Sequence, residues 1–395
     1  MLRRLLLATA ALAVAAVVLA MLFAADMADR SMNKVTAPGP YRASPAAESL
    51  LAGIDVVDLH ADALLWPRDL LTRHDHGHVD LPRLREGHVA LQVFSVVTKT
   101  PRGINYERNT AETDNITLLA ITERYPVRAW FSLRERALWQ AHRLQDAAAR
   151  SLRSRDGLPE LRIIRTRDDL ARLLADRRGG QATIGGILAT EGLHPLEGKL
   201  ENLDTLVAAG FRMFGFTHFF DNEVGGSAHG VSHGGLTPFG RAVVQRIDSL
   251  GMIIDVAHAS PRLVDDVLAT TRRPVVVSHG GVQGTCPGPR NLSDDQLARI
   301  AATGGIVGIG YWDGAICDPT PAAFARAVVH AVRVAGEDHV ALGSDFDGAT
   351  TTPFDASAMG VVAEALRTAG LTDAQVTKIM GGNALRLLGT LLPER

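Results

Sequence analysis

Short apolar runs alternate with longer amphipathic segments over most of this chain. Eight runs have the length and composition of buried strands, at residues 54–59, 89–97, 183–190, 211–217, 252–257, 274–278, 305–310 and 340–344. Apolar residues recur at helical spacing near residues 200–209, 238–250, 261–270, 294–302, 321–335, 357–368 and 372–388. Strands that alternate with helices pair in parallel, and eight such units close a barrel. The pattern therefore predicts an α/β fold of the TIM (β/α)8 barrel type.

The stretch between the second and third apolar runs is less regular. Apolar spacing predicts one long helix over residues 109–145 and a short strand at 161–164. A further helix is predicted to begin at Thr166, because Asp169 stands three positions later and can complete a capping box. The sequence shows no internal repeat, so residues 53–395 are expected to form a single barrel domain.

The amino terminus departs from this pattern. A positive flank at residues 3–4 precedes an almost unbroken apolar run that continues to Ala25. About 20 apolar residues can span a bilayer, whereas a secretory signal usually has a shorter core and a clear cleavage site. We interpret residues 1–25 as an uncleaved anchor that holds the domain outside the cytoplasm. The alternative is a signal peptide cleaved near Phe23-Ala24-Ala25, which would give a periplasmic protein. The polar residues 26–52 contain three prolines and are expected to be a linker.

The composition limits the classes of partner. The 395 residues are 46% hydrophobic and carry a formal net charge of -2, which allows a large core and argues against nucleic acid as the main partner. Two cysteines, Cys286 and Cys317, are too few for a disulfide scaffold or a cysteine-rich zinc site. They can pair in an oxidising compartment or remain as buried thiols.

Most of the strand-like runs end in side chains that can bind metal or move protons. The first run leads to His60 and Asp62, which point the same way because strand residues alternate between faces. Later runs lead to Glu191, His218, His258, His279 and Asp345. Any one of these histidines alone would be interpreted as a buried, hydrogen-bonded residue. Together, at the end of the barrel where catalytic residues gather, they predict an active site.

A binuclear metal centre accounts for five of these residues, namely His60, Asp62, Glu191, His258 and His279. Three imidazoles and two carboxylates exceed the needs of one tetrahedral zinc with an open position, but suit two metals bridged by a carboxylate. Nitrogen and oxygen ligands without thiolate fit Zn²⁺, with Mn²⁺ or Co²⁺ not excluded. Such a centre can deprotonate a bridging water and polarise a carbonyl, which is hydrolytic chemistry. Asp345 is placed to handle the proton.

Other polar residues are interpreted as structural. Residues 73–81 carry three alternating histidines, but the segment is polar and ends no apolar run. We expect a loop there that is held by hydrogen bonds from His78 and Asp80, in preference to a further metal site. Asp347 is expected to brace the loop that follows Asp345. Asp255 lies within its strand and is expected to point away from the ligands.

Six stretches together resemble the renal or membrane dipeptidases, the M19 zinc peptidases. They are Asp58-Leu59-His60-Ala61-Asp62, Glu191-Gly192, Gly235-Leu236-Thr237-Pro238-Phe239-Gly240, Ile254-Asp255-Val256-Ala257-His258, Gly343-Ser344-Asp345-Phe346-Asp347-Gly348, and Ser278-His279 followed by Arg290-Asn291. The resemblance extends in order over roughly residues 54–388. It implies a metal-dependent hydrolase of the TIM-barrel type that cleaves dipeptides with two zinc ions.

The resemblance also implies roles for the ligands. His60 and Asp62 would hold one zinc, His258 and His279 the other, and Glu191 would bridge them.

Three further residues match family positions that act on the substrate. His218 matches the histidine that steadies the tetrahedral intermediate, and Arg290 the arginine that binds the substrate's C-terminal carboxylate. Asp345 matches the carboxylate that assists proton transfer and meets the substrate amine. A guanidinium suits this carboxylate-binding role because it grips such a group bidentately. Cys286 and Cys317 follow successive strands and match paired cysteines of the family, so we predict a disulfide.

The chain departs from the family after His218. The family often shows Asn-x-x-Trp-Ala-Asp there, whereas this sequence has Phe219-Phe220-Asp221-Asn222-Glu223-Val224-Gly225-Gly226. This loop should border the substrate, so the preferred side chains stay open. His229 and His233, in the same glycine-rich loop, are candidates for pocket residues.

Two alternatives to a dipeptidase remain at this level. A related binuclear hydrolase could act on an N-acyl amino acid or a lactam, since both can offer the carboxylate that Arg290 would bind. A non-catalytic, membrane-anchored binding protein is the other alternative, although all five metal positions are present. The oligomeric state is open, with a homodimer among the options.

Overall fold

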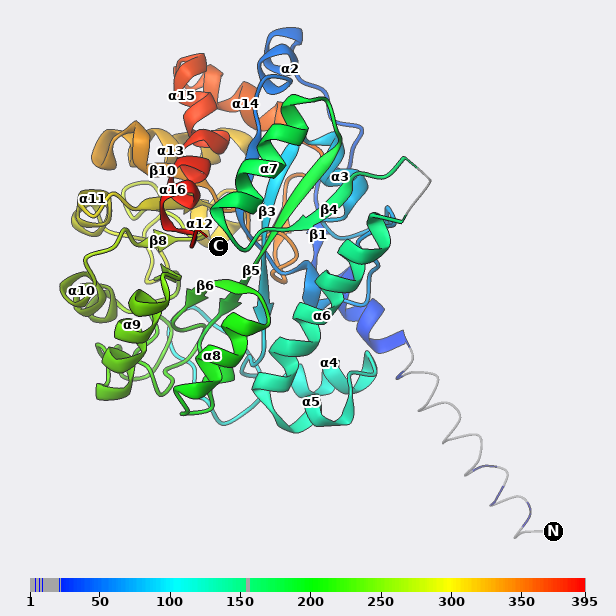
Figure 1. The fold of residues 1–395 in the computed structure, drawn as a ribbon, viewed down its shortest axis with the longest axis vertical. Coiled ribbons are helices and arrows are strands. Elements are labelled where there is room, and N and C mark those ends of the chain that lie inside the picture. Colours follow the sequence, from blue (N-terminus) through cyan, green and yellow to red (C-terminus); the bar gives the residue numbers. More distant parts are fainter. Residues whose placement is uncertain are drawn as a thin grey trace.

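The computed structural model describes residues 23–153 and 157–394, together with residues 4, 7, 9 and 21. Its centre is a closed barrel of parallel strands, as predicted (Figure 1). The strands are, in order around the barrel, β2 (Val56–Ala61), β3 (Val89–Val97), β5 (Thr183–Glu191), β6 (Phe211–Gly215), β7 (Ile253–Asp255), β8 (Val276–Val277), β9 (Ile306–Ile309) and β10 (Val340–Leu342). The ring closes where Leu342 lies opposite Asp58. All eight predicted runs are therefore barrel strands, several of them shorter than predicted.

Helices form the outer layer of the barrel. They are α8 (Glu201–Ala208), α9 (Pro238–Leu250), α10 (Pro261–Thr270), α11 (Asp294–Ala302), α13 (Pro321–Ala335), α14 (Met359–Thr368) and α16 (Asn383–Leu391). Four begin at a Ser or Thr whose side chain accepts a hydrogen bond from a backbone N–H in the first turn, namely Thr237, Ser260, Ser293 and Thr320. Each buries one apolar stripe, as in α9, where Val243, Val244 and Ile247 face the strands. Apolar residues inside the barrel pack on Leu387 and Leu388 of α16.

The predicted long helix over residues 109–145 is wrong. The segment forms three helices, α4 (Ile116–Thr122), α5 (Val127–Phe131) and α6 (Leu133–Ser151). Pro126 disfavours helical backbone at the residue before it, and Arg124 takes a left-handed φ of 59°. Ser132 is extended and caps α6 by accepting from the Glu135 N–H. These two local signals outweigh the apolar spacing.

The predictions of the short strand and of the helix that begins at Thr166 are confirmed. The short strand appears as β4 (Glu160–Ile163), which pairs with the start of β5. Helix α7 (Arg167–Arg178) begins with the predicted Thr166–Asp169 capping box. The last predicted helix is divided into α15 (Asp373–Thr377), a π-helical turn η4 (Lys378–Gly382) and α16. Shorter elements complete the structure: η1 (Ala63–Leu65), α3 (Leu81–Glu86), η2 (His194–Leu196), α12 (Asp313–Ile316) and η3 (Glu337–His339).

The segment predicted as a linker lies along the domain in this structure. It contains a helix over residues 23–32, then β1 (Lys34–Val35), which pairs with β11 (Thr351–Thr352), and α2 (Pro45–Leu51), which packs beside α14. Within the described residues, no helix combines the length and apolarity needed to cross a bilayer. The apolar run predicted to do so falls almost wholly outside them.

Candidate metal centre and active site

The five predicted metal ligands come together at the carboxyl ends of the strands. Glu191, the last residue of β5, lies at the centre. Its Oε1 atom is 3.6 Å from His60 Nε2, 3.0 Å from His258 Nε2 and 3.3 Å from His279 Nε2. Asp62 Oδ1 approaches the same Nε2 atom of His60, at 3.5 Å. One carboxylate thus faces three imidazoles, which is the arrangement a bridging ligand requires.

The donor atoms fit a bound cation. Three sets of described residues each place their donor atoms within 4.8 Å of one another: His60, Asp62 and Glu191; Glu191, His258 and His279; and His60, His279 and Asp345. All these side chains are buried, and His60 Nε2, Asp62 Oδ1 and Glu191 Oε2 have no hydrogen-bond partner among the described residues. An unpaired buried polar atom costs about 1–3 kcal/mol, which coordination would relieve. The donors are nitrogen and oxygen only, as borderline divalent metals prefer.

Burial has opposite effects on the two kinds of ligand. It raises the pKa of Glu191 well above its usual value, and the nearby Asp62 carboxylate raises it further. It lowers the pKa of His258 and His279 well below 6.5, and the Arg290 cation adds to that shift. Both imidazoles are therefore neutral, which is the form that binds metal. Burial also disfavours the charge on His60, but Asp62 and Glu191 outweigh this and raise its pKa to about 10.

Hydrogen bonds behind the ligands fix their positions. The hydroxyl of Ser278 lies 2.9 Å from His279 Nδ1, which leaves Nε2 for the cluster. His258 has a left-handed φ of 61°, and its carbonyl accepts a 3.0 Å bond from the Thr217 hydroxyl. Such a backbone conformation is unfavourable for a residue with a side chain, so it persists only where contacts enforce it.

His218 and Asp345 lie beside the five ligands. His218 Nε2 is 3.4 Å from Glu191 Oε2, and Asp345 Oδ1 is 3.9 Å from His60 Nε2. Burial raises the pKa of Asp345 to about 8; His60 opposes this shift and Asp62 reinforces it. A carboxyl group with a pKa near neutrality can both accept and donate a proton.

Arg290 lies at the edge of the same cluster. Its guanidinium donates a 2.8 Å bond from Nη2 to the carbonyl of His279 and lies 5.7 Å from the ring centre of Trp312. The side chain is 6% exposed, and its Nε has no partner among the described residues. Burial lowers the pKa of its guanidinium below the usual value for arginine, although Asp345 partly offsets this. A buried cation with an unused donor is prepared to bind an anion.

Sequence reasoning missed two aromatic residues at this site. Trp312 follows β9 and donates a 3.1 Å bond from its Nε1 to the hydroxyl of Tyr106, which lies in the loop after β3. The place of Trp312 just beyond a barrel strand was a usable signal. Tyr106 had none, since its loop carries no apolar pattern.

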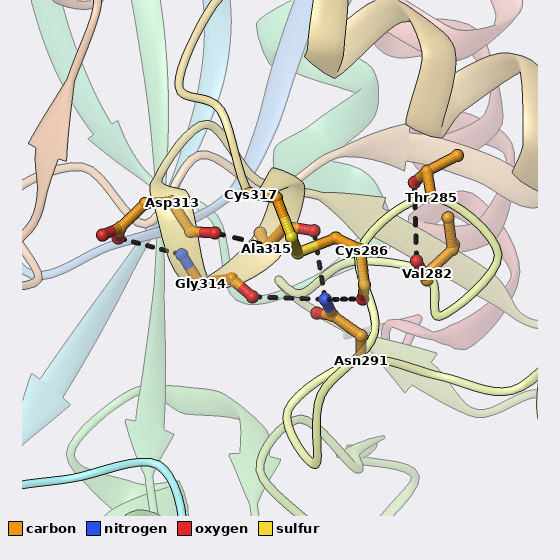
Figure 2. Close-up of a disulfide and its surroundings, with 8 residues drawn as sticks. All are labelled: Val282, Thr285, Cys286, Asn291, Asp313, Gly314, Ala315 and Cys317. Carbon is orange, nitrogen blue, oxygen red and sulfur yellow. Dashed lines mark hydrogen bonds between the residues drawn. A yellow bond between two sulfur atoms is a disulfide. The ribbon is translucent and has the colours of Figure 1, made fainter.

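A disulfide joins the loop after β8, which carries Arg290, to the residue after α12, and Figure 2 shows this bond. Cys286 and Cys317 are bonded with their Cα atoms 5.4 Å apart, which confirms the predicted pairing. Asn291, next to Arg290, donates from Nδ2 to the carbonyls of Cys286, Gly314 and Ala315 at 2.7, 3.2 and 3.2 Å. The loop after β8 is thereby joined to α12, directly after Trp312.

The residues interpreted as structural have structural partners. Asp347 accepts from the backbone N–H groups of His78 and Val79 at 2.7 and 3.1 Å, and so braces its loop as predicted. Asp80 caps α3 by accepting from the Arg83 N–H. Asp255 accepts from the amides of Ala257 and Ser278 and is not among the grouped donors.

The two candidate pocket histidines differ. His229 is buried, with its ring stacked on Phe219 at 5.0 Å and 5.5 Å from that of His258. His233 is exposed. Of the two, only His229 borders the cluster in this structure.

Comparison with known proteins places this site in a family. A family model described as membrane dipeptidase (peptidase family M19) matches residues 45–392. The dipeptidase aclJ of Aspergillus oryzae is 28% identical over 87% of this chain and 79% of its own length. An uncharacterized dipeptidase of Schizosaccharomyces pombe is 27% identical over 79% of this chain and 71% of its own length.

Solved structures agree with these matches. The dipeptidase AC, a metallopeptidase of family M19, superposes with a TM-score of 0.66 at 26% identity, over 86% of this chain and 99% of that one. A metallopeptidase from Rhodobacter sphaeroides, liganded with a phosphinate mimic of the dipeptide L-Ala-D-Ala, gives a TM-score of 0.66 at 25% identity over the same shares. Because the family model spans nearly the whole barrel, the chain belongs to the membrane dipeptidase family, peptidase family M19.

Proposed function

We propose that this protein hydrolyses the peptide bond of small dipeptides and uses two zinc ions per chain. The observation that carries the proposal is the juxtaposition of two features. A buried cluster of five metal-type donors shares His279 with a buried guanidinium, because Arg290 donates to the carbonyl of that ligand. A hydrolytic centre next to a fixed cation suits a substrate whose scissile bond lies close to a carboxylate.

The donor set divides naturally between two cations. His60 and Asp62 would hold one, His258 and His279 the other, and Glu191 would reach both from its central position. When bound, two such cations supply Lewis acidity, which lowers the pKa of a water and polarises a carbonyl.

The remaining residues bind and orient the substrate. Arg290 would pair with its C-terminal carboxylate, and the ring of Trp312 limits the directions the guanidinium can take. Asp345, with its pKa near 8, would accept a proton during attack and return it to the leaving amine. His218, kept neutral by burial, offers a hydrogen bond to the oxygen that becomes negative.

The dipeptide class is favoured over other small amides by the comparisons. The Rhodobacter relative is described with a mimic of L-Ala-D-Ala in place. N-acyl amino acids and lactams also offer a carboxylate, so they are the alternative substrates.

The experiment compares dipeptides with their C-terminal amides. Losing one partner of a buried charge pair costs about 2–5 kcal/mol, so Arg290→Ala should lower kcat/KM for dipeptides by some tens-fold to thousands-fold. The amides should already be poor substrates and lose little more. The exposed Arg262 is the matched control. Arg262→Ala removes a cation on the surface and should change kcat/KM neither for dipeptides nor for their amides.

Three results would count against the proposal. Equal hydrolysis of dipeptides and amides would mean that Arg290 does not bind the terminus. Faster turnover of N-acyl amino acids than of any L-L or L-D dipeptide would favour the alternative class. Elemental analysis of the active protein should find about two zinc ions per chain, and one metal or fewer would refute the binuclear centre.

We also propose that residues 1–25 anchor the protein and leave the barrel domain outside the cytoplasm. The apolar run and its basic flank support this. The disulfide fits an oxidising compartment, because such bonds are rare in the cytosol.

A further inference from the structure

Exposed apolar side chains are concentrated in two segments of the described chain. Of twelve large hydrophobic residues that are strongly exposed there, ten lie either at or before Met32 or between β3 and α6. Phe131 is 83% exposed, Val127 61% and Leu118 59%. Scattered single residues of this kind are ordinary, but a concentration marks an interaction surface.

Val127 and Phe131 share one face of α5. They stand four positions apart, so their side chains lie one above the other, while Ala129 on the opposite side is fully buried. Arg124 and Arg128 are exposed in the same short segment. The result is an apolar tip with cations beside it.

This tip lies at the carboxyl end of the barrel. Glu197, which follows β5, accepts hydrogen bonds from the Ser132 hydroxyl at 2.8 Å and the Leu133 N–H at 2.7 Å. Those two bonds hold the junction of α5 and α6 against a loop that leaves the strand ends.

Helix 23–32 occupies the same end and the same side. Its Ala28 and Leu119 of α4 pack against one cluster formed by Leu65, Trp66, Val97 and Ile116. The buried Asp29 bonds to Arg68 at 2.7 Å, which fixes this helix to the loop after β2. Figure 1 draws the helix, in dark blue, on the side of the molecule where α4 and α5 lie.

The outward face of helix 23–32 is also apolar. Phe23 is 56% exposed and Met27 66%, again four positions apart. The apolar run over residues 5–25 leads directly into this helix. An exposed apolar face that continues from a predicted membrane segment is expected to contact lipid.

We propose that the outward face of helix 23–32 contacts the lipid bilayer together with the apolar tip of α5 and the neighbouring Leu118 of α4. The barrel domain then lies on the membrane with its carboxyl end turned towards the lipid, and does not project on a free linker. The side chains that enter the interface are Phe23, Met27, Leu118, Val127 and Phe131. Arg124 lies where anionic headgroups would attract it, whereas Arg128 is paired with Glu135 at 2.8 Å. This inference rests on the proposed anchoring.

The test uses the full chain in vesicles of phosphatidylethanolamine and phosphatidylglycerol. Both native cysteines are in the disulfide, so a single introduced cysteine can be labelled with an environment-sensitive dye. Phe131→Cys reports the tip. Ala208→Cys is the matched control, because Ala208 is exposed at the end of α8, before β6, and hence at the opposite end of the barrel. Unchanged dipeptide turnover shows that both labelled proteins are folded.

Lipids that carry a quencher near the headgroup should remove about half of the emission at position 131 and little at position 208. Equal quenching at the two positions would overturn the inference while leaving the anchor intact. Energy transfer between dyes at position 131, without lipid quenching, would assign the tip to a second copy of the chain and also overturn it. Failure of the chain to float with the vesicles would overturn the anchor as well.

Discussion

Asp345 and Asp347 are two residues apart in one loop, and they lie in opposite electrostatic surroundings. Both are buried, both have a left-handed φ, and both have a histidine beside them. Asp347 accepts from two backbone N–H groups and pairs with Arg68 at 2.7 Å. Asp345 faces Asp62 and Glu191 across the metal-type cluster, and its nearest cation, His60, is 3.9 Å away.

The pKa values follow from these partners. Burial raises both, but Arg68 and His78 more than reverse the effect at Asp347, whose pKa falls below its usual value. At Asp345 burial dominates and the pKa rises to about 8. Residue type, depth and backbone are nearly the same at the two positions, so the charges that face each carboxylate decide its role. The paired group stabilises the fold, and the group among like charges is available for chemistry.

The largest effect is expected from Glu191→Gln, which removes the negative charge at the centre of the five proposed metal ligands. An amide is a poor bridging ligand, so metal and activity should be lost together, with turnover down by about a thousandfold or more, or about 4 kcal/mol. Metal content and dipeptide turnover are the measurements. Glu201→Gln, an exposed change at the start of α8, should alter neither metal content nor turnover. Retained activity in the Glu191 variant would remove this residue from the bridge.

Asp345→Asn should lower the catalytic rate without lowering the stability of the fold. The amide cannot exchange a proton, so kcat should fall by about 10²–10³. The metals should stay, and the free energy of unfolding of the metal-free protein should not fall, because a carboxyl group with a pKa of about 8 is mostly neutral at pH 7 and its replacement breaks no strong ion pair. A parallel loss of kcat and stability would mean that the carboxylate of Asp345 is a structural group like that of Asp347.

Asp347→Asn should show the reverse pattern. Removing one member of a buried ion pair leaves the positive charge of Arg68 without its Asp347 partner, and this typically costs about 3–5 kcal/mol of stability. Turnover per folded molecule and metal content should stay near their original values. Urea denaturation measures the change, and Asp265→Asn, which breaks an exposed pair with Arg299, should cost less than about 1 kcal/mol.

The smallest effect concerns pH. Because the pKa of Asp347 is lower in the folded protein than in the unfolded chain, its contribution is complete above the ordinary pKa near 4 and is lost as the pH falls below it. Between pH 6 and pH 3 the original protein should therefore lose about 1–2 kcal/mol more unfolding free energy than Asp347→Asn. Parallel curves for the two proteins would show that this carboxylate is not held in its charged form.

Local patterns predicted the barrel and the ligand positions, since a buried strand and the residue at its end are adjacent in sequence. Pro126 carried a local signal as well, but the apolar spacing around it gave the wrong helix. The contact between Tyr106 and Trp312 joins distant loops, so no short window contains it. The opposite pKa shifts of Asp345 and Asp347 depend on burial and on the distances to His60, Asp62 and Arg68, which only the folded chain sets.

The pairing of the first barrel strand with the last has a consequence for how the site forms during synthesis. His60 belongs to the first barrel strand and Asp345 follows the last, and these strands are neighbours because Leu342 lies opposite Asp58. His60 therefore cannot take its place beside Asp345 until the ribosome has delivered nearly the whole domain and the last strand has joined the first. A fragment cut short before β10 would contain all five proposed metal ligands but would lack Asp345 and the strand that closes the barrel. The complete site, with His60 beside Asp345, therefore exists only in the fully synthesised and closed barrel.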